Sequence, residues 1–288
     1  MPENELAFRT NANKDYLRSV YDRRIIEAWG ARVGHTLNYL GLPGPEMLDI
    51  VEWEPFLDRF STIERRENEQ HLLYLRANVK DLEHRLHSLY GEFDDILIKG
   101  RDEYGHAPKW PYDLVNLDFF GGFLYRDLSR PRSLAKLIEN QDNHGRSFLL
   151  IISYHLRDGD FTGEKLAFLD DLSRKLSRDL KDSKRVSEPM EWYRSGQTPD
   201  AARQTLYLNA FLHDHGEAHR FHVACRPAVV YSGTGGARMI HFVTEFQHQG
   251  RAHRAVSPQS LVDVVDLGYV ELRDRKFVEP VEFPRLGG

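Results

Sequence analysis

The chain has 288 residues, of which 41% are hydrophobic and 29% charged, so it can bury a sizeable core in one α/β domain, with or without an appendage. Its single cysteine, Cys225, excludes a disulfide framework and a cysteine-based zinc site, and it indicates a reducing compartment. A net charge of −5 argues against a surface coated with nucleic-acid-binding charge, although Arg126, Arg130 and Arg132 cluster locally. The sequence shows neither a long apolar run nor a signal-peptide core, so we expect a cytoplasmic protein with no membrane partner.

The first third of the chain predicts alternating helices and strands. Helical spacing of apolar side chains predicts a helix over residues 14–30, and the apolar run Leu37–Leu42 predicts a strand that continues through a Pro-Gly-Pro loop into a helix. A second strand is expected to end at Glu64. A long helix over residues 67–91 and a short strand at Ile96–Ile98 follow. The apolar stripe of the long helix comprises Leu72, Leu75, Val79, Leu82, Leu86 and Leu89.

The stretch Tyr112–Gly122 is the most informative part of the sequence. Its apolar residues lead to Asp118, which is followed by two phenylalanines and two glycines. This pattern is typical of a buried parallel strand that brings a carboxylate to the carboxyl edge of a sheet, where open α/β proteins bind ligands.

The second half of the chain predicts a helix at Ser133–Asn140, a very apolar fifth strand near residues 147–155 and a further helix near residues 164–180. Residues 183–202 form a candidate linker. Two β-rich runs joined by Gly-Thr-Gly-Gly then predict a hairpin, on which His241 and His248 are expected to be exposed. Four histidines between residues 213 and 222 are interpreted as a surface group, and no metal site is expected.

Five strands separated by helices and completed by a hairpin resemble the plan of class I S-adenosylmethionine-dependent methyltransferases. Asp118, Phe119, Phe120 and Gly121 further resemble the branch with Asp-Pro-Phe-Gly after the fourth strand, found in transfer-RNA guanine methyltransferases and three-Cys-motif partner proteins. The resemblance implies a Rossmann-like, mostly parallel sheet that ends in an antiparallel hairpin, with helices on both faces. It implies an N-terminal helical segment (1–31), a methyltransferase-type domain (32–250) and a small C-terminal appendage (251–288).

The same resemblance implies where S-adenosylmethionine would bind. Gly41 and Gly44 would let the backbone approach the methionine part, and Glu64 would accept hydrogen bonds from the ribose hydroxyls. Asp102 would contact the adenine. Asp118 would orient a base nitrogen of transfer RNA or DNA, and Phe119 or Phe120 would stack on that base.

Each candidate residue also has a purely structural interpretation. Asp118 would cap a turn, Glu64 would belong to a solvated charged run, Gly41 and Gly44 would make a tight turn, and Asp102 would lie in an ordinary loop.

Two other functions stay open. The loop carries Pro43 and Pro45, and Phe119 replaces the proline of the family pattern, so the chain could instead be a catalytically degenerate scaffold or partner subunit. That alternative predicts that Pro43, Pro45 and Trp53 fill the cofactor pocket and that an apolar patch is exposed elsewhere, ready for a protein partner. A third possibility is an enzyme that binds a different adenosine ligand at Glu64.

Overall fold

A computed structural model describes residues 11–119, 121–124, 128–156, 164–179, 200–233, 236–250, 263–264 and 267–278. The predicted linker, apart from its last residues, and Phe120 lie outside these ranges.

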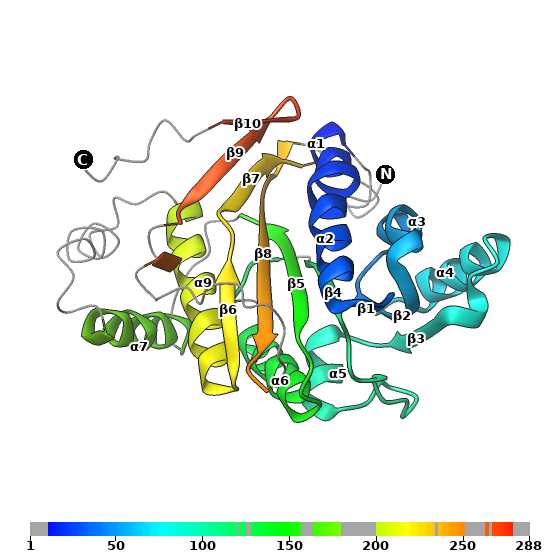
Figure 1. The fold of residues 1–288 in the computed structure, drawn as a ribbon, viewed down its shortest axis with the longest axis horizontal. Helices are drawn as coiled ribbons and strands as arrows, with labels where there is room; N and C mark the ends of the chain where they lie inside the picture. Colours follow the sequence, from blue (N-terminus) through cyan, green and yellow to red (C-terminus); the bar gives the residue numbers. More distant parts are fainter. Residues whose placement is uncertain are drawn as a thin grey trace.

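The described strands form one ten-stranded sheet that runs through the middle of the molecule (Figure 1). Its order is β10-β9-β7-β8-β5-β4-β1-β2-β3, and β6 also pairs with β8. Strands β1 to β5 are parallel, whereas β8 runs antiparallel to β5, β6 and β7. The strands are β1 Leu37–Gly41, β2 Leu57–Glu64, β3 Leu86–Tyr90, β4 Leu114–Phe119, β5 Phe148–His155, β6 Phe221–Cys225, β7 Ala228–Ser232, β8 Arg238–His248, β9 Tyr269–Arg273 and β10 Lys276–Val278.

This topology confirms the predicted Rossmann-like, mostly parallel α/β sheet with an antiparallel hairpin at its end. The predicted hairpin corresponds to β7 and β8. Strand β6 comes just before β7 in the chain, and Arg226 and Pro227 separate the two strands. The described part of the C-terminal appendage supplies β9 and β10, and β9 pairs in parallel with β7, so this part extends the same sheet.

Helices cover both faces of the sheet. The helical elements are α1 Ala12–Tyr16, the π-helix η2 Leu17–Asp22, α2 Arg23–Val33, α3 Leu48–Trp53, η3 Glu54–Phe56, α4 Glu67–Val79, η4 Glu83–Arg85, α5 Phe93–Lys99, α6 Ser129–Asn143, α7 Glu164–Asp179 and α9 Asp200–Ala218. The first three of these form one continuous helical arm that confirms the predicted N-terminal helix. The arm ends at Gly34, whose left-handed φ of 76° gives the usual stop for a helix.

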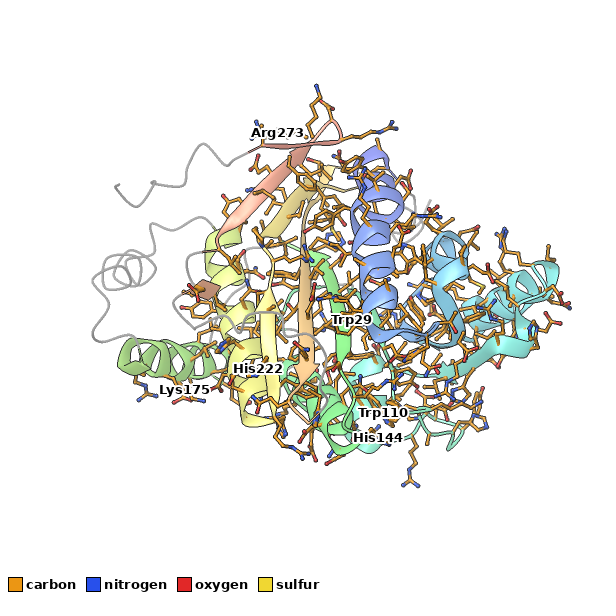
Figure 2. All side chains as sticks on the ribbon, viewed as in Figure 1. Trp29, Trp110, His144, Lys175, His222 and Arg273 are labelled. Carbon is orange, nitrogen blue, oxygen red and sulfur yellow. The ribbon has the colours of Figure 1, made fainter. Side chains whose placement is uncertain are left out.

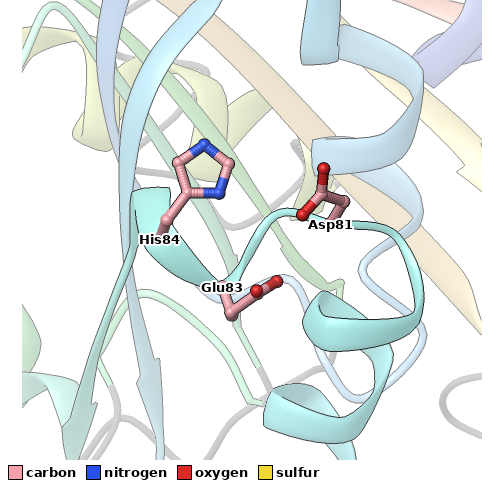
Figure 3. A group of neighbouring side chains, drawn as sticks. All are labelled: Asp81, Glu83 and His84. Carbon is pink, nitrogen blue, oxygen red and sulfur yellow. The ribbon is translucent and has the colours of Figure 1, made fainter.

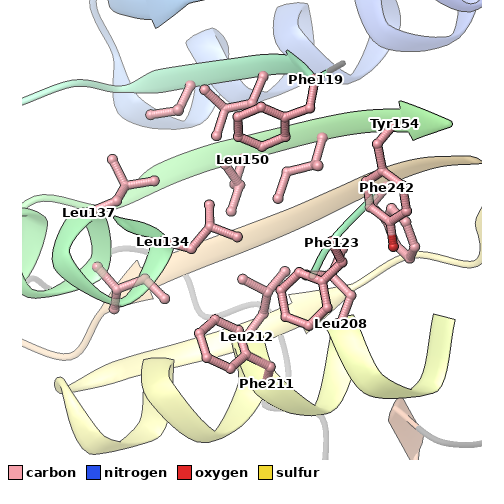
Figure 4. Packing of buried hydrophobic residues seen from close by; sticks show 14 of the residues in the cluster. Phe119, Phe123, Leu134, Leu137, Leu150, Tyr154, Leu208, Phe211, Leu212 and Phe242 are labelled. Atoms are coloured by element: carbon pink, nitrogen blue, oxygen red, sulfur yellow. The ribbon is translucent and has the colours of Figure 1, made fainter. Parts of the chain in front are cut away.

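Alternating side chains of the central strands divide the core into two apolar layers. On one face, residues of α2, α3 and α4 pack on β1, β4 and β5, and Trp29 fastens α2 to the sheet by donating to the Asp113 carbonyl oxygen at 2.9 Å (Figure 2). On the other face, α5, α6, α7 and α9 pack on the alternate residues of β4, β5 and β8, among them Leu150 and Phe242, and Phe211 of α9 belongs to this layer (Figure 4). Leu114 therefore faces α2, whereas its neighbour Val115 faces the opposite layer.

Two predicted elements between β2 and β4 are wrong. The long helix over residues 67–91 stops at Val79, because Asp81 takes a left-handed φ of 56° and the Leu82 N–H donates back to the Ala77 carbonyl oxygen. The rest of that segment becomes β3, which pairs with β2. The predicted strand at Ile96–Ile98 is instead the centre of helix α5.

Candidate functional site

The strand order reverses between β1 and β4, because the chain proceeds outward from β1 to β3 and then returns to the other side of β1 as β4. In open α/β sheets such a reversal leaves a crevice outside the carboxyl ends of the two central strands, and ligands bind there. The carboxyl ends of β1 and β4 therefore define the candidate site.

The strand register places the predicted acids on one face of the sheet at this edge. Gly41 pairs with Thr62 on β2 and with Asn116 on β4, so these three residues share a face. Glu64 and Asp118 lie two residues farther along their strands and therefore point the same way. The two carboxylates flank the loop that follows β1.

The row of polar side chains continues beyond β4. Asp118 pairs with Ser153 on β5, and Ser153 pairs with His241 on β8. Four strand spacings separate β2 from β8, so the row from Glu64 to His241 extends over about 19 Å. A single edge of the sheet thus offers an acid, a second acid, a hydroxyl and an imidazole in sequence.

The N-terminal helical arm covers the middle of this row. Lys14 of α1 forms an ion pair with Asp118 (Nζ to Oδ2, 2.5 Å), and Arg18 of η2 lies 3.6 Å from Asp49. These residues, with Ser153, line a pocket whose empty space, including its open mouth, is about 350 Å³. Part of that space is open solvent, so the enclosed volume of the pocket is smaller than 350 Å³.

Tyr39 occupies the space above Gly41. A Cβ at position 41 would collide with the Tyr39 ring, so the glycine makes room for a side chain of its own strand. The Tyr39 hydroxyl donates to Asp49 Oδ2 at 3.3 Å, and the Asn116 side-chain amide donates to the same oxygen at 2.6 Å. Burial raises the pKa of both Tyr39 and Asp49; Arg18 opposes the shift at Asp49. Gly44, with φ of 63°, accepts a hydrogen bond from the Met47 N–H at 3.2 Å.

Glu64 is buried at the end of β2, with 8% of its surface exposed. Its Oε1 accepts hydrogen bonds from the backbone N–H groups of Arg65 and Arg66 at 2.8 and 3.1 Å. Burial and then the neighbouring Glu69 raise its pKa to about 7. On the same face, the buried Thr62 hydroxyl finds no hydrogen-bond partner among the described residues. This end of the row therefore holds a polar group that a ligand would satisfy.

Asp102 lies beyond the carboxyl end of β3 and is hydrogen-bonded to Tyr90, the residue that pairs with Glu64. Its carboxylate accepts hydrogen bonds from the backbone N–H groups of Tyr90, Tyr104 and His106 at 3.1, 2.9 and 2.7 Å. Burial would raise its pKa, but the backbone donors outweigh burial and lower it. Because β3 ends at Tyr90, the acid that directly follows the third strand is Glu92, and the adenine contact expected at Asp102 stays a prediction.

Phe119 points to the opposite face from Asp118. Its ring is 4% exposed, contacts Phe93 edge-on at 5.4 Å, and has the Arg130 guanidinium 3.7 Å from its centroid. Arg130 in turn lies 3.8 Å from Asp94. Burial raises the pKa of Asp94, and the positive charge of Arg130 reduces that rise. The structure therefore does not bring Phe119 and Asp118 to one substrate, and Phe120 lies outside the described residues.

Most pocket residues were not singled out from the sequence as part of this site, among them Lys14, Asp49, Ser153 and His241. His241 is 3% exposed and His248 5%, so the expectation that both are exposed is wrong. Ser153 carried no motif. The one hint of its role is the position of β5 next to β4. The β5 residue that pairs with Asp118 is Ser153, and it therefore faces the same pocket.

One group of potential metal ligands converges among the described residues. Asp81, Glu83 and His84 place their ligand atoms within 4.8 Å of one another on the exposed turn after α4 (Figure 3). The group lies outside the candidate site, and exposed acidic groups of this kind are common without a metal. No helix in the described ranges is both long and apolar enough to span a membrane.

Comparison with known proteins gives only distant structural similarity. No protein-family model and no curated protein matches the sequence. Solved structures that resemble the chain include a proposed RNA methyltransferase from Pyrococcus horikoshii, with 12% identity, a TM-score of 0.45 and coverage of 88% of this chain and 90% of that one. Another is the O-methyltransferase TomG from Streptomyces achromogenes in complex with SAM, with 13% identity, a TM-score of 0.41 and coverage of 83% and 92%. These similarities assign neither activity nor substrate to this chain.

Proposed function

We propose that the chain binds S-adenosylmethionine in the crevice between β1 and β4 and transfers its methyl group to an acceptor. The observation that carries the proposal is the placement of Glu64 and Asp118 on one face of the sheet, on either side of the loop after β1. The sequence resemblance to class I methyltransferases supports the same function.

The polar side chains at the end of β2 fit the adenosyl end of this cofactor. Glu64 would accept hydrogen bonds from the ribose hydroxyls, and the unpartnered Thr62 hydroxyl lies on the same face. The methionine end fits only if Lys14 and Arg18 move away from Asp118 and Asp49, and if the Tyr39 ring leaves Gly41. When bound, the cofactor supplies an electrophilic methyl group on sulfur, and Asp118 would orient the acceptor toward it.

Isothermal titration of the full chain with S-adenosylmethionine at pH 8 tests the proposal. We expect saturable binding that weakens at least tenfold in Glu64→Gln, since the neutral amide is a poorer acceptor for the ribose hydroxyls than a carboxylate. The control Glu139→Gln, on α6 and paired with Lys136, should bind as the wild type does. Titrations with adenosine and ATP test the third function left open by the sequence, an enzyme for another adenosine ligand.

A partner subunit without catalysis is the second candidate, and two observations favour it. Tyr39 lies over Gly41, and the buried Trp53 lines the pocket beside Asp118, so both side chains limit the room for a cofactor. Helix α4 also exposes Leu72, Leu75 and Val79, at 52%, 62% and 86%. The absence of cofactor binding at millimolar concentration would remove the methyltransferase proposal and leave this one.

The finer predictions concern the acceptor and the place of action. Nucleic acid as acceptor depends on the Asp-Phe-Phe-Gly resemblance and on local arginines, but Arg130 is buried against Phe119. An electrophoretic shift with transfer RNA and with DNA tests it, and equal indifference to both would remove it. The cytoplasmic location and the three segments 1–31, 32–250 and 251–288 stay predictions.

A further inference from the structure

Three side chains that are far apart in the sequence form a continuous hydrogen-bonded chain beside Asp118. The Ser153 hydroxyl lies 2.8 Å from Nδ1 of His241, and Nε2 of the same ring lies 2.9 Å from Asp22 Oδ1. They come from β5, β8 and η2, and all three line the pocket under the N-terminal arm. The order of groups is hydroxyl, imidazole and carboxylate.

Burial fixes how protons are arranged along this chain. Asp22, His241 and Ser153 are 4%, 3% and 8% exposed, so water cannot replace their hydrogen bonds. The Asp22 carboxylate only accepts, which makes Nε2 of a neutral His241 the donor and leaves the Nδ1 lone pair facing Ser153. His241 is therefore held in the tautomer that accepts a proton from the serine side.

The π-helix η2 places the carboxylate. In an α-helix, residues five apart point about 140° away from each other, because each residue turns the helix by about 100°. The wider π turn brings them to one side, and Leu17 and Asp22, at its two ends, both line the pocket. Such π turns occur often at functional sites. The irregular helix therefore directs Asp22 toward His241.

Ser153, His241 and Asp22 line the same pocket as Asp118. Asp118 precedes Ser153 in the row across the sheet, so an acceptor held at Asp118 would lie next to the Ser153 hydroxyl. The other charged or titratable groups lining this pocket are Lys14, Arg18, Asp49 and Tyr231. The Tyr21 ring also packs edge-on against His241 at 6.1 Å.

A second buried pair with the same chemistry lies elsewhere in the molecule and provides a comparison. Nε2 of His248 lies 3.0 Å from Asp142 Oδ1, but Asp142 also binds Arg220 at 2.9 Å. On the other side of the ring, Nδ1 accepts a hydrogen bond from the Gly250 N–H at 3.1 Å. Neither His248 nor Asp142 lines the pocket, so this pair ties chain segments together.

We propose that Ser153, His241 and Asp22 form a proton relay for a hydroxyl acceptor of the phenol or enol class. This proposal rests on the methyl transfer proposed above. An exocyclic amine of a nucleobase attacks through its lone pair and loses its proton afterwards, so it needs only a hydrogen-bond acceptor such as Asp118. A phenolic oxygen attacks well only as its proton leaves, and the His241 imidazole is a base within reach of that proton through Ser153.

The step balances with the methyl sulfonium as donor. The acceptor oxygen forms the new bond to the methyl carbon, and the carbon–sulfur bond breaks with its electron pair remaining on sulfur. The acceptor proton passes to the Ser153 oxygen, while the Ser153 hydroxyl proton passes to Nδ1 of His241. Asp22 stabilises the imidazolium that results. Ser153 contacts the acceptor, and His241 and Asp22 act through it.

Nitrogen NMR of the full chain with ¹⁵N-labelled histidine tests the relay without the cofactor. Phenol is the probe, and anisole, which has the same ring but no acidic proton, is its control. We expect bound phenol, by donating to Ser153, to strengthen the Ser153–His241 hydrogen bond and so to shift the Nδ1 resonance of His241, and anisole to leave it unchanged. The phenol effect should vanish in Ser153→Ala. Failure of phenol to bind, or phenol binding that leaves His241 unmoved, would overturn the relay.

Methyl transfer to phenol from radiolabelled S-adenosylmethionine gives the second readout. Asp22→Asn should lower the rate on the order of 10² to 10³-fold and flatten its rise with pH, whereas Asp142→Asn should leave rate and profile unchanged. Equal losses in both variants, or a full rate in Asp22→Asn with an unchanged melting temperature, would overturn the proposal. Failure of the cofactor to bind in calorimetry would instead refute the proposed methyl transfer, and the NMR result stays separate from it.

Discussion

Asp118 and Phe119 are consecutive residues of β4, yet they belong to two different environments. Asp118 faces the N-terminal arm and a pocket lined by Lys14 and Ser153, whereas Phe119 faces a sealed layer in which Arg130 covers its ring. The difference follows from the alternation of side chains along a strand. Two consecutive residues thus lie in two environments, and we expect the proposed chemistry on the Asp118 side and a packing role on the Phe119 side.

The largest expected effect is on the Phe119 side. Phe119→Ala removes a ring that is 4% exposed, together with its contacts to Phe93 and Arg130, and should lower the free energy of unfolding by about 3 to 5 kcal/mol. Urea denaturation followed by circular dichroism measures the loss. A loss below about 1 kcal/mol would show that the ring is not part of the core and would restore Phe119 as a stacking residue.

The next effect concerns Glu64 and depends on pH. Because burial raises its pKa from 4.5 to about 7, the folded chain binds this proton more tightly than the unfolded chain does. Stability is therefore lost as pH rises from about 4.5 through about 7, by on the order of 3 kcal/mol. Glu64→Gln should be more stable than the wild type at pH 8 and nearly equal to it at pH 5, by thermal melting.

The opposite dependence on pH is expected for ligand binding at Glu64. Its carboxylate accepts from ribose hydroxyls when ionised, so affinity for S-adenosylmethionine should rise between pH 6 and pH 8 in the wild type and stay flat in Glu64→Gln. A flat wild-type profile would show that Glu64 does not contact the ligand.

A smaller effect is expected on the Asp118 side. Lys14→Ala breaks a partly buried ion pair and should cost about 1 kcal/mol or less, because both side chains keep some contact with water. The same change should tighten S-adenosylmethionine binding, since Asp118 and the pocket become accessible. Lys136→Ala, which breaks a surface pair with Glu139, is the control for charge loss. Weaker cofactor binding in Lys14→Ala would show that the arm helps to bind the ligand.

The smallest effect is expected on α4. Val79→Ser changes a side chain that is 86% exposed and should alter the free energy of unfolding by less than about 0.5 kcal/mol. A larger loss in urea denaturation would show that the apolar stripe of α4 is covered in solution, which would favour the partner-subunit alternative.

The sequence predicts the strands that surround the site because their apolar runs are long and uninterrupted. It places Asp118 and Glu64 at strand ends, as the structure has them. It fails at β3, where Leu86 and Leu89 continue a helical spacing although a left-handed turn at Asp81 has already ended the helix. The helix ends where the backbone of Asp81 turns left-handed, and the pattern of apolar residues does not encode that turn.

The polar partners could not be predicted for a different reason. His241 is buried because Ser153 and Asp22, 88 and 219 positions away, satisfy its two nitrogens. Likewise, Gly41 matches a glycine-rich loop in sequence, but Tyr39 folds over it. Such contacts depend on how distant segments meet, and a single sequence does not show that.

A crystal structure of the full chain with S-adenosylhomocysteine tests the central claim most directly. The account predicts ribose hydroxyls within hydrogen-bond distance of Glu64, the sulfur next to Asp118, and Lys14 displaced from Asp118. A crevice still closed by Tyr39 and Lys14 at saturating ligand, or a ligand bound away from the carboxyl ends of β1 and β4, would contradict it.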